Sequence, residues 1–350
     1  MARSLSKCMA QEIKTIRIAG GGLAGLSLGI ALRLRKIPVI LHEALQYPRH
    51  RVCGEFISGV QTDTLETLGI RNFLEKVSRP NQATWWSYEN FLGTFALPEA
   101  AYAISRYHLD HQLSEHLRQL GGEIHEKSRL QPDASEGTVW SAGRRPTHGP
   151  WIGLKAHIRD IDLKAGLEMH LGTKAYVGMV GIENGWINVC GIFPLRENLT
   201  RKDPPLLLTY LDAVGLSSLS KRLSAATWRE NSQSAVAGFR LGKQAELPQL
   251  ACIGDSHSII PPFTGNGMSM ALEAAALAVE PLVDYAHHDS SWEETLQRIQ
   301  SAAEEKFHRR LQLADICQQL LLAPWFRKPL EILAHDSLLP FHSLFSLTRR

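Results

Sequence analysis

Three glycines near the start of the chain are spaced to receive a phosphate group. Gly20, Gly22 and Gly25 follow the pattern G-x-G-x-x-G. Between a strand and a helix, the first glycine makes a tight turn and the second lets backbone N–H groups approach a pyrophosphate. The third lets the helix pack closely on the strand. The positive end of the helix dipole, at Leu23 and Ala24, adds attraction for an anion. This spacing predicts a dinucleotide-binding turn.

An acidic residue stands where such a turn requires one. Glu43 ends a second apolar strand about twenty residues after the last glycine, which is the expected separation. Its carboxylate can accept hydrogen bonds from a ribose diol and would repel a 2′-phosphate. The expected elements are a strand at 16–19, a helix at 23–34 and a strand at 38–42. The alternative is a glycine turn in an ordinary α/β unit.

A second glycine-bearing stretch lies far along the chain. The apolar strand expected at 249–253 ends in Gly254 and Asp255. A carboxylate at this position can reach a sugar or ribityl hydroxyl. A helix follows a turn that contains Pro262, Gly265, Asn266, Gly267 and Met268. Glycines at a helix N-terminus expose N–H groups and favour partial negative charge, such as that of a reduced flavin. The alternative is a plain strand–loop–helix connection with Asn266 as N-cap.

The polar loop at 46–59 carries candidates for catalysis. Loops at the carboxyl ends of parallel strands line the ligand crevice in α/β folds. Cys53 is either a reactive thiol or a small packing group, and Glu55 is either a proton donor or a structural carboxylate. Lys155 and His157 could face a substrate cavity, although a histidine within a sheet more often has a structural role. No catalytic residue is assigned from the sequence beyond these candidates.

Composition limits the function classes. The chain has 350 residues, 44% hydrophobic residues and a net charge of +3, which indicates a globular protein and gives no case for nucleic-acid binding. The small positive charge is compatible with anionic cofactors or weak contact with a membrane surface. The cysteines are scattered without metal-ligand or redox spacing, so we expect no metal site and a cytoplasmic location. Residues 1–11 are expected to be a loose leader.

The fold class expected is α/β, with a Rossmann-like cofactor domain built from separate stretches. Residues 12–80, 101–150 and 246–288 are assigned to this domain, and 289–350 to a helical C-terminal region. Residues 81–100 and 151–245 are assigned to an inserted, mostly antiparallel sheet for the substrate. Within these regions we expect a hairpin at 82–97, a helix at 206–223, a helix at 268–286 interrupted near Pro281, and one or two helices at 290–322.

The order and separation of these motifs resemble a known group of flavoenzymes. The glycine fingerprint, the Gly254-Asp255 strand and the stretch PPFTGNGM resemble FAD-dependent oxidoreductases of the group A monooxygenase (para-hydroxybenzoate hydroxylase-like) and geranylgeranyl reductase type. RVCGEFIS at 51–58 resembles the R-x-C-G-E-x-x-S stretch of the reductase branch. ISRYHLDHQL at 104–113 resembles the I-x-R-x-x-L/F-D-x-x-L motif of the group. The resemblance spans residues 16 to about 285.

The resemblance implies which residues lie at each part of bound FAD. It places Gly20, Gly22, Gly25 and Glu43 at the ADP half, with Arg51 and Arg106 facing the phosphate or flavin region. It places Asp255 near the ribityl or pyrophosphate group and residues 265–268 at the isoalloxazine.

Two departures from the pattern bear on function. Ala142 stands where group A hydroxylases have an aspartate tied to NAD(P)H interactions, so NADH or NADPH is one electron donor to consider among others. Met179, Val180 and Gly181 stand where geranylgeranyl reductases carry an aromatic stretch, so a geranylgeranyl substrate is not implied. We therefore predict a monooxygenase that hydroxylates or epoxidises an apolar or aromatic small molecule. The alternatives are a reductase of substrate C=C bonds and a non-catalytic flavin-binding electron-transfer partner.

Overall fold

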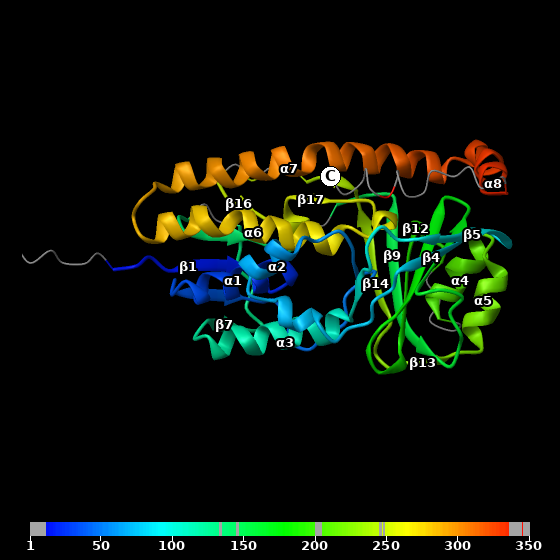
Figure 1. The fold of residues 1–350 in the computed structure, drawn as a ribbon, viewed down its shortest axis with the longest axis horizontal. Coiled ribbons are helices and arrows are strands. Elements are labelled where there is room, and N and C mark those ends of the chain that lie inside the picture. The colour runs from blue at the N-terminus through cyan, green and yellow to red at the C-terminus, as the bar shows by residue number, and fades with distance from the viewer. Residues whose placement is uncertain are drawn as a thin grey trace, which may run out of the picture.

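The computed structural model describes residues 12–132, 135–144, 147–199, 205–244, 247, 249–335 and 345. The expected leader at 1–11 and most of the C-terminal stretch beyond residue 335 lie outside the described residues. The described chain forms two large sheets and two short two-stranded ones, with long helices alongside the large sheets (Figure 1).

The first sheet is parallel. Its strands are β1 (Ile16–Ala19), β2 (Val39–His42), β7 (Glu123–His125), β8 (Thr138–Trp140) and β16 (Ala251–Cys252). Their spatial order is β16-β8-β1-β2-β7, so strands from both ends of the chain meet in one sheet. The side chains of Ile16, Ile18, Val139 and Ala251 are fully buried, as expected for strands covered on both faces.

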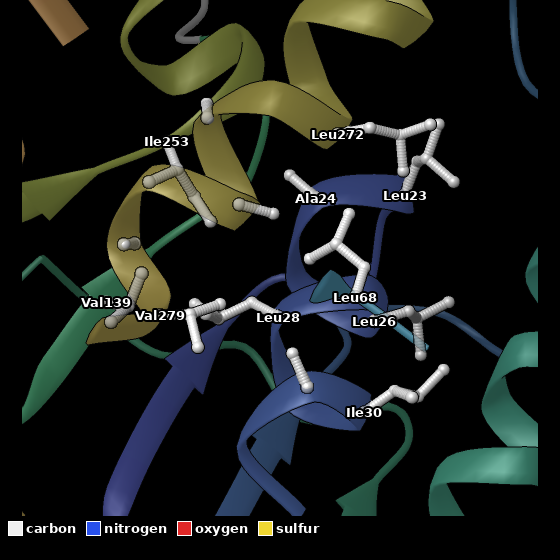
Figure 2. Close-up of a cluster of buried hydrophobic side chains, with 14 of the residues drawn as sticks. Leu23, Ala24, Leu26, Leu28, Ile30, Leu68, Val139, Ile253, Leu272 and Val279 are labelled. Carbon is white, nitrogen blue, oxygen red and sulfur yellow. The ribbon is translucent and has the colours of Figure 1, made fainter. Parts of the chain in front are cut away.

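Helices from distant parts of the chain pack together beside this sheet. They are α1 (Leu23–Leu34), α3 (Arg106–Gln119) and α6 (Gly267–Ala286). Apolar side chains of α1 meet Leu272 and Val279 of α6 and Val139 of β8 in a single core (Figure 2). This packing fixes the N-terminal ends of α1 and α6 relative to each other. Smaller elements of this part are α2 (Thr62–Thr67), β3 (Phe56–Ile57) paired with β6 (Tyr102–Ala103), and β15 (Gly242–Lys243) paired with β17 (Ser258–Ile259).

The second sheet is mostly antiparallel. Its strands are β4 (Gln82–Ser87), β5 (Asn90–Ala96), β9 (Trp151–Arg159), β10 (Leu167–Gly172), β11 (Ala175–Gly181), β12 (Ile187–Pro194), β13 (Thr227–Trp228) and β14 (Ser234–Phe239). They run in the order β13-β9-β12-β11-β10-β4-β5, with β14 also on β9, and the β10–β4 pair is parallel. One face, including Leu154, Ala156 and Ile158, packs on α4 (Leu206–Ala213) and α5 (Ser217–Ser224). The alternate residues of β9 therefore point to the opposite face.

The C-terminal region is helical and connects the two sheets. α7 (Trp292–Leu322) begins with a capping box between Ser291 and Glu294 and extends from the first sheet to the second (Figure 1). Tyr176 of β11 donates a hydrogen bond to Gln318 of α7 at 3.1 Å. α8 (Arg327–His335) follows and packs near β5. Within the described ranges, no helix combines the length and apolarity needed to span a bilayer.

The helix expected to be interrupted near Pro281 is in fact continuous, so that prediction was wrong. α6 runs unbroken from Gly267 to Ala286, with Pro281 buried. A proline inside a helix forfeits one backbone hydrogen bond. Packing of α6 against α1 and α7 compensates for this loss.

Other expected helices and strands are present, with smaller differences. The hairpin at 82–97 is β4 and β5, and residues 290–322 form one helix rather than two. The stretch at 206–223 divides into α4 and α5 at Gly215, whose φ of +82° ends the first helix. β10 was not anticipated, although Leu167, Met169 and Leu171 alternate as a strand requires.

Candidate cofactor site and active site

The glycines of the first turn occupy different environments. Gly20 has φ +107°, and a Cβ there would lie 2.4 Å from the Ser141 carbonyl oxygen. A Cβ on Gly25 would lie 2.1 Å from the Gly20 carbonyl oxygen, so both positions require glycine for packing. A Cβ on Gly22 would meet nothing closer than the Arg106 guanidinium, at 3.8 Å. Gly22 therefore borders open space, as close approach of a phosphate group requires.

The second turn lies directly against the first helix. Gly254 has φ +61°, and a Cβ there would lie 3.2 Å from the Cβ of Ala24. The N-cap residues of α1 and α6 are Gly22 and Asn266. In the described structure, neither helix has a capping hydrogen bond from the side chain of its N-cap residue. Uncapped helix N-termini attract anions and partial negative charge. The predicted halves of the site are thus adjacent in space.

Several predicted cofactor residues can offer only their backbone. The side chains of Leu23, Ala24 and Met268 are buried in the core, and the Asn266 side chain is fully buried. Gly265 has φ +67° and ends the short 3-10 helix η4 (Pro262–Thr264). Their backbone groups, rather than their side chains, are the ones placed to meet a ligand.

Glu43 is held by four donors. Its carboxylate accepts hydrogen bonds from the backbone N–H groups of Gly21 and Leu45, both at 3.0 Å, and from Arg49 at 2.8 Å and Arg51 at 3.3 Å. Burial acts to raise the pKa of Glu43, but Arg51 and Arg49 outweigh it and hold this pKa below its usual value. Glu43 is therefore an anion fixed at the glycine turn.

Arg51 and Arg106 converge on one carboxylate that the sequence did not single out. Asp110 of α3 accepts from Arg51 Nε at 2.9 Å, and from Arg106 Nε and Nη2 at 2.7 and 2.9 Å. Arg51 also donates to the Gly21 carbonyl at 3.1 Å. Burial alone would lower the pKa of Arg106, but Asp110 raises it above its ordinary value, so this guanidinium stays charged.

Asp255 lines a small pocket together with Gly254 and Gly267. Its side chain is accessible to solvent, yet the protein around it raises the pKa of the carboxyl, against the opposing charges of Arg106, Arg144 and Arg51.

A buried ionic cluster joins the loop at 46–59 to the second sheet. Glu55, Lys155 and His157 all have side chains at 0% exposure. The Glu55 carboxylate accepts from Lys155 Nζ at 3.0 Å and from the Arg106 backbone N–H at 2.9 Å, and it contacts His157 Nε2 at 2.7 Å. Burial opposes ionisation, but the bond to His157 and the charge of Lys155 lower the pKa of Glu55 overall.

The cluster extends toward the surface through His50. Its Nδ1 lies 3.3 Å from Lys155 Nζ, and its ring stacks on Tyr107 at a centroid distance of 4.6 Å. Burial, followed by the charges of Lys155, His157 and Arg229, lowers the pKa of His50 to about 4. His50 is thus neutral near pH 7.

Two buried polar atoms at this junction lack partners among the described residues. They are His157 Nδ1 and Asn188 Oδ1, and these two residues face each other across β9 and β12. Buried polar atoms in folded proteins are normally hydrogen-bonded, so this place can bind a polar group. Cys53 lies beside it, since its carbonyl accepts from Asn188 Nδ2 at 3.0 Å. Burial raises the pKa of Cys53, which disfavours a reactive thiolate.

A buried apolar cluster lies on the second sheet, next to the turn before α6. The Phe263 N–H donates to Tyr176 Oη at 3.2 Å, so the turn before α6 touches the second sheet. The apolar side chains gathered there are Leu92, Met169, Leu171, Tyr176, Ile192 and Phe239. The second glycine turn therefore lies between the α1–α6 core and an apolar sheet face.

Residues that sequence reasoning missed include Asp110, Tyr47 and Asn188. Tyr47 donates to the Gly21 carbonyl at 2.6 Å. Asp110 stands within the I-x-R-x-x-L/F-D-x-x-L motif, which was the available signal. Tyr47 and Asn188 had no comparable signal, because their roles depend on contacts with distant segments.

Solved flavoenzyme structures share this fold. The flavin-dependent brominase Bmp2 matches with a TM-score of 0.70 at 15% identity, over 97% of this chain and 94% of that chain. Klebsiella pneumoniae HpxO, solved with FAD and uric acid, matches with a TM-score of 0.72 at 12% identity, over 97% of this chain and 99% of that chain. A geranylgeranyl bacteriochlorophyll reductase-like protein from Thermoplasma acidophilum matches with a TM-score of 0.72 at 15% identity, over 93% of this chain and 92% of that chain.

These likenesses establish the fold. The chain has the mixed α/β architecture, with a parallel sheet and a helical C-terminus, of flavin-dependent oxidoreductases, and the fold implied by the sequence resemblance is confirmed. Neither known family models nor curated proteins give a match to the sequence.

Proposed function

We propose that this protein is an FAD-dependent monooxygenase acting on an apolar or aromatic small molecule. The observation that carries the proposal is the meeting of the two glycine-bearing stretches, where Gly254 lies against Ala24 and α6 packs on α1. FAD is long enough to need two such turns. The shared fold with structures solved as flavoenzymes supports the same cofactor.

The residues present fit FAD. Gly22 leaves open space at an uncapped helix N-terminus, where a pyrophosphate would be bound by N–H groups and by Arg106. Glu43 would accept hydrogen bonds from the ribose hydroxyls in place of a bond that it now accepts from Arg49 or Arg51. Asp255 would lie at the ribityl or pyrophosphate region, where its carboxylate could accept from ribityl hydroxyls. Residues 265–268 would place the uncapped N-terminus of α6 near the isoalloxazine. Residues 12–80, 101–150 and 246–288 would form the cofactor domain, and 81–100 with 151–245 the substrate sheet.

The substrate would be placed between the second turn and the second sheet. Bound FAD supplies hydride and oxygen-transfer chemistry. The apolar face with Met169 and Tyr176 would hold and desolvate an apolar or aromatic substrate. His157, held by Glu55, presents its unpartnered ring nitrogen as the group that could move a proton. A small-molecule substrate is supported by HpxO, which shares this fold and was solved with uric acid bound.

A reductase of C=C bonds is the second candidate function. The loop with Cys53 and Glu55 and the fold of the reductase-like protein favour it. A non-catalytic electron-transfer role is the third, because Ala142 replaces an aspartate tied to NAD(P)H. NADH or NADPH is proposed as donor on the resemblance alone.

One experiment separates these functions. The purified protein is mixed with NADH or NADPH, and flavin absorbance is followed with and without oxygen. A monooxygenase requires oxygen for product formation, whereas an ene-type reductase turns over anaerobically. Flavin that neither nucleotide reduces would favour the electron-transfer role. A preparation that binds no flavin would refute all three.

A further inference from the structure

Asp110 is a buried acid on the inner face of α3. Its side chain has 0% exposure, next to Leu109 and Leu113, which belong to the core. Burying a carboxylate is costly unless charged donors satisfy it. The donors here are two arginines from different segments, Arg51 in the loop at 46–59 and Arg106 at the start of α3. Helix stability alone does not require this arrangement.

Both arginines border the first glycine turn. Arg51 Nη2 donates to the Gly21 carbonyl at 3.1 Å, and the Arg106 guanidinium is the nearest group to the open side of Gly22. The three bonds to Asp110 use Nε of each arginine and one Nη2 of Arg106. Asp110 thus holds each guanidinium group through its Nε side. Further N–H groups of the two arginines are left for a ligand.

The local charge balance favours an anion. Arg49, Arg51 and Arg106 contribute three positive charges, and Glu43 and Asp110 contribute two negative ones. These five ion-paired side chains therefore leave one positive charge beside the uncapped N-terminus of α1. Without Asp110, Arg51 and Arg106 would repel each other at close range.

We infer that Asp110 is a positioning residue, which holds Arg51 and Arg106 in place for a diphosphate group at the first glycine turn. The inference rests on the proposed function, because the diphosphate is taken to be that of FAD. Asp110 itself does not touch the ligand. It acts through the two guanidinium groups, whose positions it fixes before the ligand binds.

The test is the affinity of the apo protein for FAD and for riboflavin, which lacks the diphosphate, measured by quenching of flavin fluorescence. D110N should weaken FAD binding by about tenfold or more, since each tenfold corresponds to about 1.4 kcal/mol. Riboflavin affinity should change by less than about twofold, because it makes no phosphate contact. D63N, the same change at an exposed position in α2, is the matched control and should alter neither affinity.

Each result decides the inference. Tighter FAD binding by D110N would mean that Asp110 only neutralises charge and would overturn the inference, as would an equal loss of FAD and riboflavin affinity. If D110N does not fold, D110E keeps the charge but displaces the carboxylate, and it should show the same FAD-selective loss. Wild-type protein that binds FAD while both variants bind it equally well refutes the inference alone. Wild-type protein that binds no FAD refutes the proposed function as well.

Discussion

Single residues of the candidate site are held by buried charges. Glu55 is satisfied by Lys155, His157 and the Arg106 N–H without access to water. Burying such groups costs several kcal/mol per ion, so the cluster is weak evidence for stability and stronger evidence for function. Substitution of one residue of this cluster would leave the charge of its partner buried without a counter-charge.

Glu55→Gln should therefore destabilise the protein by about 3–5 kcal/mol, because Lys155 would remain buried without its counter-charge. Urea unfolding measures this change. Glu75→Gln, at an exposed position, is the control and should have an effect within about 0.5 kcal/mol. A Glu55 variant as stable as the control would show that the ionic cluster is not intact in solution.

His50 makes the stability depend on pH. Its pKa is lowered to about 4 in the folded protein, whereas an unfolded histidine titrates near 6.5. The unfolded chain then binds more protons between these values, so stability falls as pH drops from about 6.5 to about 4. His50→Gln removes this titration and should reduce the loss of melting temperature between about pH 7 and pH 4.5. An identical loss in the variant and the wild type would contradict the assigned environment of His50.

At the scale of elements, the glycine turn has two separable tasks. Gly25 lets α1 pack against the turn, whereas Gly22 keeps space open beside Arg106. The same change from glycine to alanine should therefore have different effects at the two positions.

Gly25→Ala should destabilise the fold by about 2 kcal/mol or more, because the added Cβ would overlap the Gly20 carbonyl. Gly22→Ala should fold normally, since its φ is −83° and its Cβ has room. It should nevertheless weaken FAD binding by about tenfold or more. Thermal melts and FAD titrations of both variants provide the comparison. Full FAD affinity in Gly22→Ala would argue against a phosphate at this turn.

The sequence predicted contacts within a motif better than contacts between segments. The spacing of Gly20, Gly22 and Gly25 located the turn, because its geometry is local. Asp110 stands in a recognised motif but was not singled out, because its partner Arg51 comes from another segment. The continuity of α6 through Pro281 likewise depends on its neighbours rather than on local propensity.

At the scale of the whole molecule, the candidate cofactor site is assembled from stretches near both ends of the described chain. The parallel sheet places β16 beside β8 and close to β1, and α6 packs on α1 (Figures 1 and 2). α7 then links this part to the second sheet through the bond between Tyr176 and Gln318. A ligand bridging the two turns should therefore stabilise the fold globally.

FAD at about one hundred times its Kd should add about 2.7 kcal/mol to the stability of the native state. This gain would raise the melting temperature by a few degrees and should be absent with AMP at the same concentration, because AMP reaches only the first turn. Differential scanning fluorimetry with both ligands measures the difference. Equal shifts would show that the second turn takes no part in binding.

The most direct test of the account compares the affinities of apo protein for FAD, ADP and riboflavin by titration calorimetry. If one ligand spans both turns, we expect one FAD to bind per chain. FAD should bind at least about a hundredfold more tightly than ADP or riboflavin, because its two linked halves bind together. ADP that binds as tightly as FAD, with riboflavin having no effect on either, would contradict the claim that Gly22 and Gly267 serve the same ligand.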